Sequence, residues 1–188
     1  MAIIVVGGSG RGAGKTALIC GLIRALPDFA WTAVKITTHA HGHAEPIYEE
    51  KAPGPEEVRG PETESDTDTA RYLAAGARRA LLVTAEDHSL ASIVHQIIVE
   101  HSSPAHLVFE SNSVLHHLRP DLCLAVASDL RGARKPSYGL LEERMDASVA
   151  LGGHNHVIPG ARIHFHLRSL ERISPTMLAW VREKVPTL

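Results

Sequence analysis

Short runs of consecutive apolar residues alternate along the chain with longer segments in which apolar residues recur at helical spacing. The runs are rich in β-branched residues and lack polar alternation, which is typical of strands buried on both faces of a sheet. They predict strands at 2–7, 31–37, 79–85, 105–111 and 122–128, with shorter ones at 147–151 and 162–167. The helical spacing predicts helices at 14–26, 68–76, 89–101 and 174–185.

This alternation of strands and helices predicts an α/β fold: a three-layer, mostly parallel sheet with helices on both faces, as in phosphate-loop (P-loop) NTPases. In such sheets a ligand binds beyond the carboxyl ends of the strands. The segments that follow the predicted strands are therefore expected along one edge: 8–16, 37–43, 84–87, 110–113 and 128–135.

Length and composition indicate a single cytoplasmic domain over residues 1–188. The chain has 44% hydrophobic and 21% charged residues, as ordinary globular proteins have. No apolar run approaches the ~20 residues of a membrane span, and the first strand leaves no room for a signal peptide. Cys20 and Cys123 lie in apolar surroundings, which suits reduced core thiols. A net charge of −2 gives no basic signature for nucleic acid.

One acidic, proline-rich stretch departs from this average. Between Gly42 and Asp68 nine acidic residues accompany two basic ones and four prolines. Such a composition buries little apolar surface, so we expect a long mobile loop at about 42–65. It is either a solvated insertion or a lid that becomes ordered when a ligand binds.

The stretch "GGSGRGAGKTAL" follows the first predicted strand and opens the first predicted helix. Glycines allow backbone amides to turn inward around phosphates, Lys15 can reach the outer phosphates, and Thr16 offers a hydroxyl to Mg²⁺. The strict pattern places a glycine where this chain has Ser9, with Gly8 one place earlier. We expect nucleotide contacts from Gly10, Arg11, Gly12, Ala13, Gly14, Lys15, Thr16 and Ala17.

A magnesium site also needs a carboxylate at a strand end. Glu110 follows the buried run "HLVF" and is the first candidate. Asp66 and Asp68 compete for the role, although a residue at the start of a helix can equally serve as its cap. We therefore expect Thr16, Glu110 and Asp68 to hold Mg²⁺.

Other polar residues of the same edge are candidates for contacts with the nucleotide. His39 and His41 follow the second strand as His-x-His and can face one ligand, whereas no cysteine or carboxylate at tight spacing completes a zinc site. Lys35 lies within that strand and either points into the site or lies at its rim. Asp129 and Lys135 follow the fifth strand, where loops often contact the base.

Five segments, taken in order, resemble the molybdopterin-guanine dinucleotide biosynthesis protein B (MobB) family of P-loop GTPases: "GKTAL", "VKITTHAH", "DTDTARYLAAGA", "HLVFESN" and "PDLCLAV". The resemblance spans about two-thirds of the chain. It implies nucleotide binding and a role in molybdenum cofactor synthesis. The residues that match the family pattern are Lys15, Thr16, Lys35, His39, His41, Asp68, Thr69 and Glu110. The family usually follows its glutamate with glycine and a bulky residue, where this chain has Ser111 and Asn112.

These observations favour a Mg²⁺-dependent nucleoside triphosphatase that uses GTP or ATP, with Lys15, Glu110 and Asp68 in catalysis. The guanine-reading pattern Asn-Lys-x-Asp is absent, so the base stays open. Two alternatives share the loop. A small-molecule kinase would add an acceptor to the same site. An adaptor would hold a nucleotide or pterin cofactor for a partner protein with negligible turnover. A homodimer also stays open.

Overall fold

The computed structural model describes residues 1–37, 47–51, 67–101, 105–127, 137–152 and 158–185. Its centre is an eight-stranded sheet in the order β3-β4-β2-β5-β1-β6-β7-β8. The strands are β1 (Ile3–Gly8), β2 (Thr32–Thr37), β3 (Ile47–Lys51), β4 (Arg79–Thr84), β5 (Leu107–Glu110), β6 (Leu122–Ala127), β7 (Ala147–Leu151) and β8 (Ile163–Leu167). Neighbouring strands pair in parallel except β3, which runs antiparallel to β4 at one edge.

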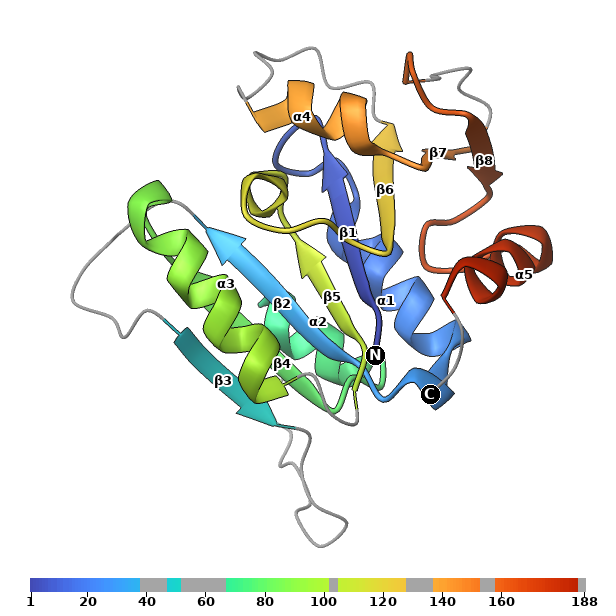
Figure 1. Ribbon diagram of the computed structural model, residues 1–188. Helices are drawn as coiled ribbons and strands as arrows, with labels where there is room; N and C mark the ends of the chain where they lie inside the picture. Colours follow the sequence, from blue (N-terminus) through green and yellow to red (C-terminus); the bar gives the residue numbers. More distant parts are fainter. Residues whose placement is uncertain (38–46, 52–66, 102–104, 128–136, 153–157, 186–188) are drawn as a thin grey trace, which may run out of the picture.

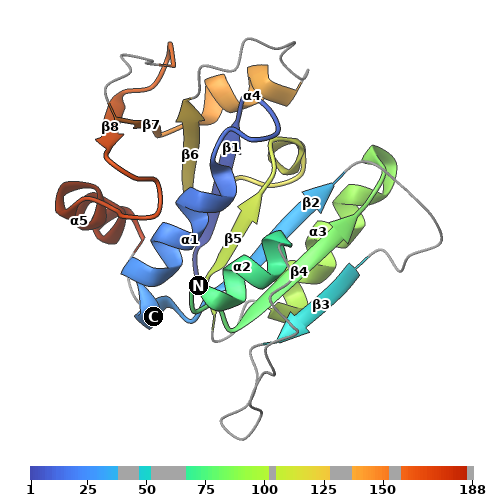
Figure 2. The same cartoon turned by 180° about the vertical axis from the view of Figure 1, so that it is seen from behind.

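Helices cover both faces of this sheet (Figures 1 and 2). The α-helices are α1 (Lys15–Ala25), α2 (Asp68–Ala74), α3 (Asp87–His101), α4 (Ser137–Arg144) and α5 (Pro175–Lys184), and two short 3₁₀ turns are η1 (Pro27–Phe29) and η3 (Ser113–His116). Two hydrophobic clusters separate the layers: α1, α2 and α5 pack on one face, and α3, η3 and α4 pack on the other. The predicted three-layer α/β architecture is confirmed.

The central strand β1 shows why the sequence folds in this way. All six of its residues are buried, because side chains on both faces of a central strand meet helices. Ile4 and Val6 pack in the α1 cluster, whereas Ile3 and Val5 pack in the α3 cluster. The arrowheads of β1, β5 and β6 point to the same edge, where α4 lies (Figure 1).

All the predicted strands and helices are present, with bounds that differ by a few residues. At the last helix, Ser174 is the N-cap, and its side chain accepts a hydrogen bond from the Met177 amide. One α-helix and one strand were missed, α4 and the edge strand β3, as were the two short 3₁₀ turns. β3 lies inside the stretch 42–65, which was expected to be one long loop, and the rest of that stretch lies outside the described residues. The sequence of β3, "IYEEK", is polar because the strand lies at an edge and pairs with one neighbour only.

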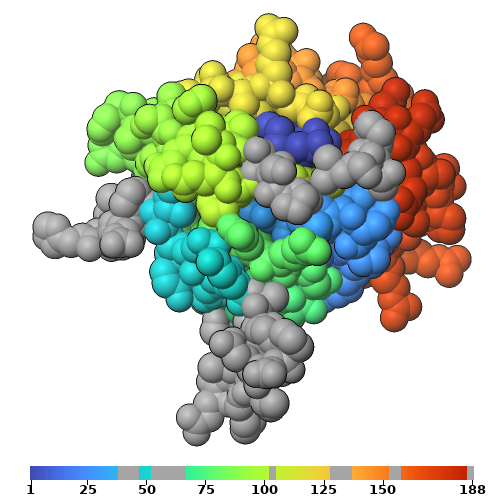
Figure 3. Space-filling view, turned by 60° about the horizontal axis from the view of Figure 1, so that its bottom comes forward, coloured from blue at the N-terminus to red at the C-terminus, as the bar shows by residue number. Residues whose placement is uncertain are grey.

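The missed strand contacts α2, and the two elements lie beside each other on the surface shown in Figure 3. Within the described residues, no helix combines the length and apolar character that a membrane crossing requires.

Candidate functional site

The loop between β1 and α1 depends on glycine at two positions. Gly12 and Gly14 have φ values of 75° and 95°, a region that other residues rarely adopt. A Cβ atom on Gly14 would also lie 2.3 Å from Leu170 Cδ1. Gly14 is the N-cap of α1 and has no side chain that could cap the helix, so an anion can approach the backbone of the first turn closely.

Lys15 and Thr16 are the first two residues of α1, at the positive end of the helix dipole. Lys15 Nζ donates a hydrogen bond to the Gly10 carbonyl oxygen at 2.6 Å, so its side chain folds back over the loop. Thr16 Oγ1 donates a hydrogen bond to Glu110 Oε2 at 2.7 Å. This contact joins the loop to the carboxyl end of β5. The loop and Glu110, expected from the sequence to share one edge, are therefore brought together.

Glu110 is a buried carboxylate that accepts three side-chain hydrogen bonds. Glu110 as a whole residue is 3% exposed. Oε2 accepts from the Thr16 hydroxyl and, at 2.5 Å, from the Tyr72 hydroxyl, and Oε1 accepts from Lys35 Nζ. A buried carboxylate needs such donors, because an uncompensated charge in the interior is costly. The strand fixes its backbone, so the carboxylate is held in a defined place.

Lys35 points into the site, which settles the orientation that the sequence left open. In the parallel register of β2 and β5, Lys35 lies beside Glu110, and the two side chains form an ion pair. Lys35 Nζ also lies 3.0 Å from Asp68 Oδ2. Burial lowers the pKa of Lys35, but the charge and hydrogen bond of Glu110 and the contact with Asp68 raise it more. The net pKa lies above its ordinary value, so the ammonium is charged at neutral pH.

Asp68 does not cap its helix, so the capping role considered from the sequence is wrong. Thr67 is the N-cap of α2, and its hydroxyl accepts a hydrogen bond from the Ala70 amide at 3.2 Å. Asp68 Oδ2 instead lies 3.0 Å from Lys35 Nζ, and Asp68 Oδ1 lies 3.9 Å from Arg71 Nη1. Burial raises the pKa of Asp68, but the hydrogen bonds and charges of Lys35, Thr16 and Arg71 lower it more. The net pKa lies below its ordinary value.

Tyr72 is a site residue that the sequence analysis missed. It is fully buried, and it lies four residues after Asp68, so both side chains leave the same face of α2. Burial raises the pKa of Tyr72 well above its ordinary value, and the nearby Glu110 carboxylate raises it further. The phenol therefore stays protonated and donates to Glu110. The i, i+4 spacing from Asp68 is the signal that could have identified it.

Asn112 is a second missed residue, and it positions the start of the loop. Its Oδ1 accepts from the Gly8 amide and its Nδ2 donates to the Gly8 carbonyl oxygen, both at 3.0 Å. The Asn112 side chain thus continues the contact with β1 beyond the end of β5. A Cβ atom on Gly7 would lie 2.6 Å from Asn112 Oδ1, so the close approach requires glycine there.

The oxygen atoms around Glu110 fit a hard divalent cation. Thr16 supplies a hydroxyl, and Glu110 and Asp68 supply two carboxylates, all at the N-terminus of α1. Mg²⁺ takes one or two protein carboxylates, with water and phosphate oxygens as its other ligands. Within the ranges that the structure describes, no group of three histidine, cysteine, aspartate or glutamate side chains is arranged around a metal position. The hydroxyl of Thr16 and the carboxylates of Glu110 and Asp68 are oxygen donors of the kind that Mg²⁺ takes together with phosphate oxygens.

The remaining candidates are placed as follows. Arg11 is exposed, Ala13 is buried and Ala17 is half-buried beside the loop. The candidates His39, His41, Asp66, Asp129 and Lys135 lie outside the described residues.

The two cysteines take no part in this site. Both thiols are free and buried. Burial raises the pKa of Cys20 to about 11 and that of Cys123 to about 12, so neither forms a thiolate readily at neutral pH.

Comparison with known proteins supports the fold. No protein-family model matches the chain, and no curated protein sequence matches it either. A solved structure that does match is LpxK from Aquifex aeolicus in complex with ATP, with a TM-score of 0.51 and 17% sequence identity. The match covers 87% of this chain and 53% of the LpxK chain, so this chain spans about half of the length of LpxK. The chain has a P-loop NTPase-like fold.

Proposed function

We propose that this protein is a Mg²⁺-dependent nucleoside triphosphate-binding enzyme that cleaves the outer phosphate bond of its nucleotide. The observation that carries the proposal is the hydrogen bond between Thr16 and Glu110. It joins a glycine-rich loop at a helix N-terminus to a buried carboxylate at the end of the adjacent strand. These are the two parts that nucleotide hydrolysis by such folds requires.

Each part of the site has a physical task in this proposal. The amides of residues 12–16 hold the inner phosphates, because they lie in the loop and at the start of α1, where the positive end of the helix dipole favours an anion. Lys15 leaves the Gly10 carbonyl and meets the charge on the outer phosphates, which grows in the transition state. A magnesium ion held by Thr16 and Glu110 would add its charge on the same side. The protein's contribution is positioning and electrostatics.

The ATP in the LpxK structure supports nucleotide binding by a chain of this fold. It supports ATP as the first nucleotide to test, and GTP is the alternative that the MobB resemblance implies. A role in molybdenum cofactor synthesis rests on that resemblance alone.

A second candidate is a small-molecule kinase, and the exposure of Asp68 favours it. The Asp68 side chain is 34% exposed, whereas that of Glu110 is 2% exposed. An acceptor hydroxyl can therefore reach Asp68 but not Glu110. An aspartate in this position can orient a hydroxyl for attack on the outer phosphate.

The experiment is a phosphate-release assay with ATP and GTP, each with and without MgCl₂. Release that requires Mg²⁺ and needs no added acceptor is the expected result. Release that stays at the uncatalysed level, together with measurable nucleotide binding, favours the kinase or the adaptor. A screen of hydroxyl-bearing acceptors for ADP or GDP formation then separates those two.

A further inference from the structure

A positive charge already lies among the oxygen atoms that fit a divalent cation. Lys35 Nζ pairs with Glu110 Oε1 and lies 3.0 Å from Asp68 Oδ2. Glu110 in turn holds the Thr16 hydroxyl through its second oxygen. The lysine ammonium therefore occupies the same carboxylates that a metal would need.

We propose that Lys35 is an internal counter-ion that closes these carboxylates to a bare divalent cation and opens them when the cation arrives with a nucleotide. This inference rests on the proposed function, because it describes how the same site is regulated. The protein then selects the metal–nucleotide complex over the free metal.

Charge balance is the first argument. The Glu110 side chain is almost fully buried, and a buried carboxylate needs a compensating cation. The ammonium satisfies this need without a metal, because Lys35 Nζ pairs with Glu110 Oε1 and lies 3.0 Å from Asp68 Oδ2. Two cations cannot share the same oxygens without strong repulsion at a few ångströms. A metal must therefore displace Lys35.

The chemistry of lysine is the second argument. Its ammonium is a compact charge on a flexible stem of four methylenes, so it can leave one anion for another without moving the backbone. Lys35 lies on β2, beside β5, and its side chain is 20% exposed. Phosphate oxygens near the start of α1 would offer the displaced ammonium a new anionic partner. Free metal offers none, so the exchange is unfavourable without nucleotide.

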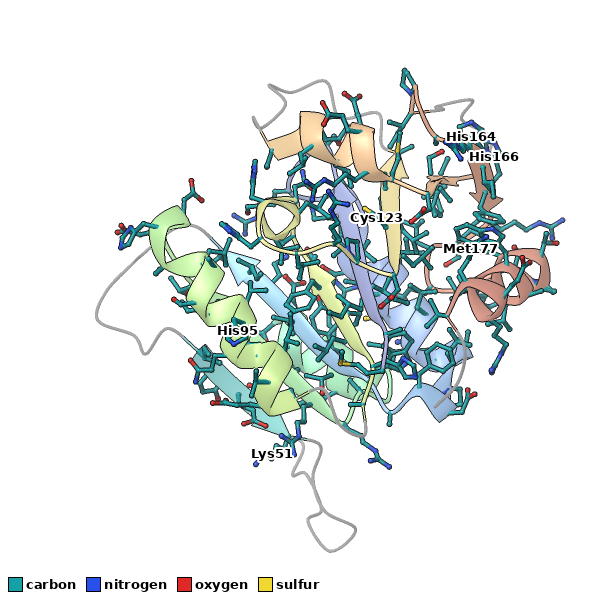
Figure 4. All side chains as sticks on the ribbon, in the orientation of Figure 1. Lys51, His95, Cys123, His164, His166 and Met177 are labelled. Atoms are coloured by element: carbon teal, nitrogen blue, oxygen red, sulfur yellow. The ribbon has the colours of Figure 1, made fainter. Side chains whose placement is uncertain are left out.

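The test measures the affinity of the nucleotide-free protein for Mn²⁺ alone. Electron paramagnetic resonance of the free ion monitors the binding. We expect Lys35→Met to bind Mn²⁺ at least about tenfold more tightly than wild type, because two carboxylates lose their internal cation. Lys35→Arg keeps a cation and should bind as wild type does. Lys51→Met is the matched control, since Lys51 lies on the edge strand β3, far from the phosphate loop (Figure 4).

Equal Mn²⁺ affinity in folded Lys35→Met and wild type would overturn the inference. An equal gain in Lys35→Arg and Lys35→Met would also overturn it, because charge would then not be the cause. If Lys35→Met is unfolded without metal, Mn²⁺ should restore its near-ultraviolet circular dichroism, and failure to do so contradicts the account.

The two proposals can fail separately. A wild-type protein that binds no nucleotide, combined with tighter Mn²⁺ binding in Lys35→Met, would remove the proposed function and leave the counter-ion in place. Nucleotide binding by the wild type, combined with an unchanged Mn²⁺ affinity in Lys35→Met, would support the proposed function and remove the counter-ion.

Discussion

The Tyr72 hydroxyl and Glu110 Oε2 lie 2.5 Å apart, and this oxygen also accepts the hydrogen bond of the Thr16 hydroxyl. One carboxylate oxygen therefore connects α2, β5 and the first turn of α1. A substitution on α2 can therefore alter the position of Thr16 at the phosphate loop through this single atom. The relationship makes Tyr72 a positioning residue for Glu110.

Tyr72→Phe should destabilise the fold by about 2 kcal/mol, since the ring stays packed while a hydrogen bond to a charged group is lost. Thermal unfolding measures the loss, and Tyr48→Phe is the control because Tyr48 is 57% exposed on the edge strand. A merely structural tyrosine would change stability alone. A positioning role predicts, in addition, that the variant needs more Mg²⁺ for hydrolysis and that saturating Mg²⁺ partly restores its activity.

Glu110→Gln should cost more Mg²⁺-dependent hydrolysis than Asp68→Asn. The strand holds the buried Glu110 beside Thr16, whereas Asp68 lies on α2 and its side chain is 34% exposed. Both substitutions keep shape and remove charge, so a magnesium titration of each compares like with like. Thr67→Ala is the control for the helix: it removes the cap of α2, costs about 1 kcal/mol, and should leave the magnesium response unchanged. A lost response in Asp68→Asn with an intact response in Glu110→Gln reverses the assignment.

The glycines of the phosphate loop should differ in their tolerance of a methyl group. Gly14→Ala should cost about 2 kcal/mol or more, because φ is 95° and the new Cβ would meet Leu170. Gly10→Ala should cost less than about 1 kcal/mol, since no atom lies within 4 Å of a Cβ there. Denaturant unfolding of the two variants is the measurement. Equal costs would mean that the loop has another conformation.

The buried strands were predictable because burial on both faces requires continuous apolar runs, as in "IIVV" of β1. β3 was not predictable, since an edge strand does not require a continuous apolar run and its sequence is typical of an acidic loop. Within the site, the spacing of glycine, lysine and threonine identified the loop directly. Tyr72 was missed, because its spacing from Asp68 shows only that the two share a face of α2, and its contact with Glu110 depends on how α2 packs on the sheet. The alternative of a capping role for Asp68 was wrong, because Thr67, one residue earlier, caps the helix.

The most direct test of the account is the triphosphate affinity of wild type and Lys15→Ala, measured by calorimetry with ATP and with GTP in the presence of MgCl₂. Lys15 lies in the first turn of α1 and folds over the loop, so its loss should weaken binding about a hundredfold, or about 3 kcal/mol. Lys51→Ala, on the edge strand, should bind as wild type does. A folded Lys15→Ala protein with wild-type affinity, or a wild type that binds neither nucleotide, would contradict the account.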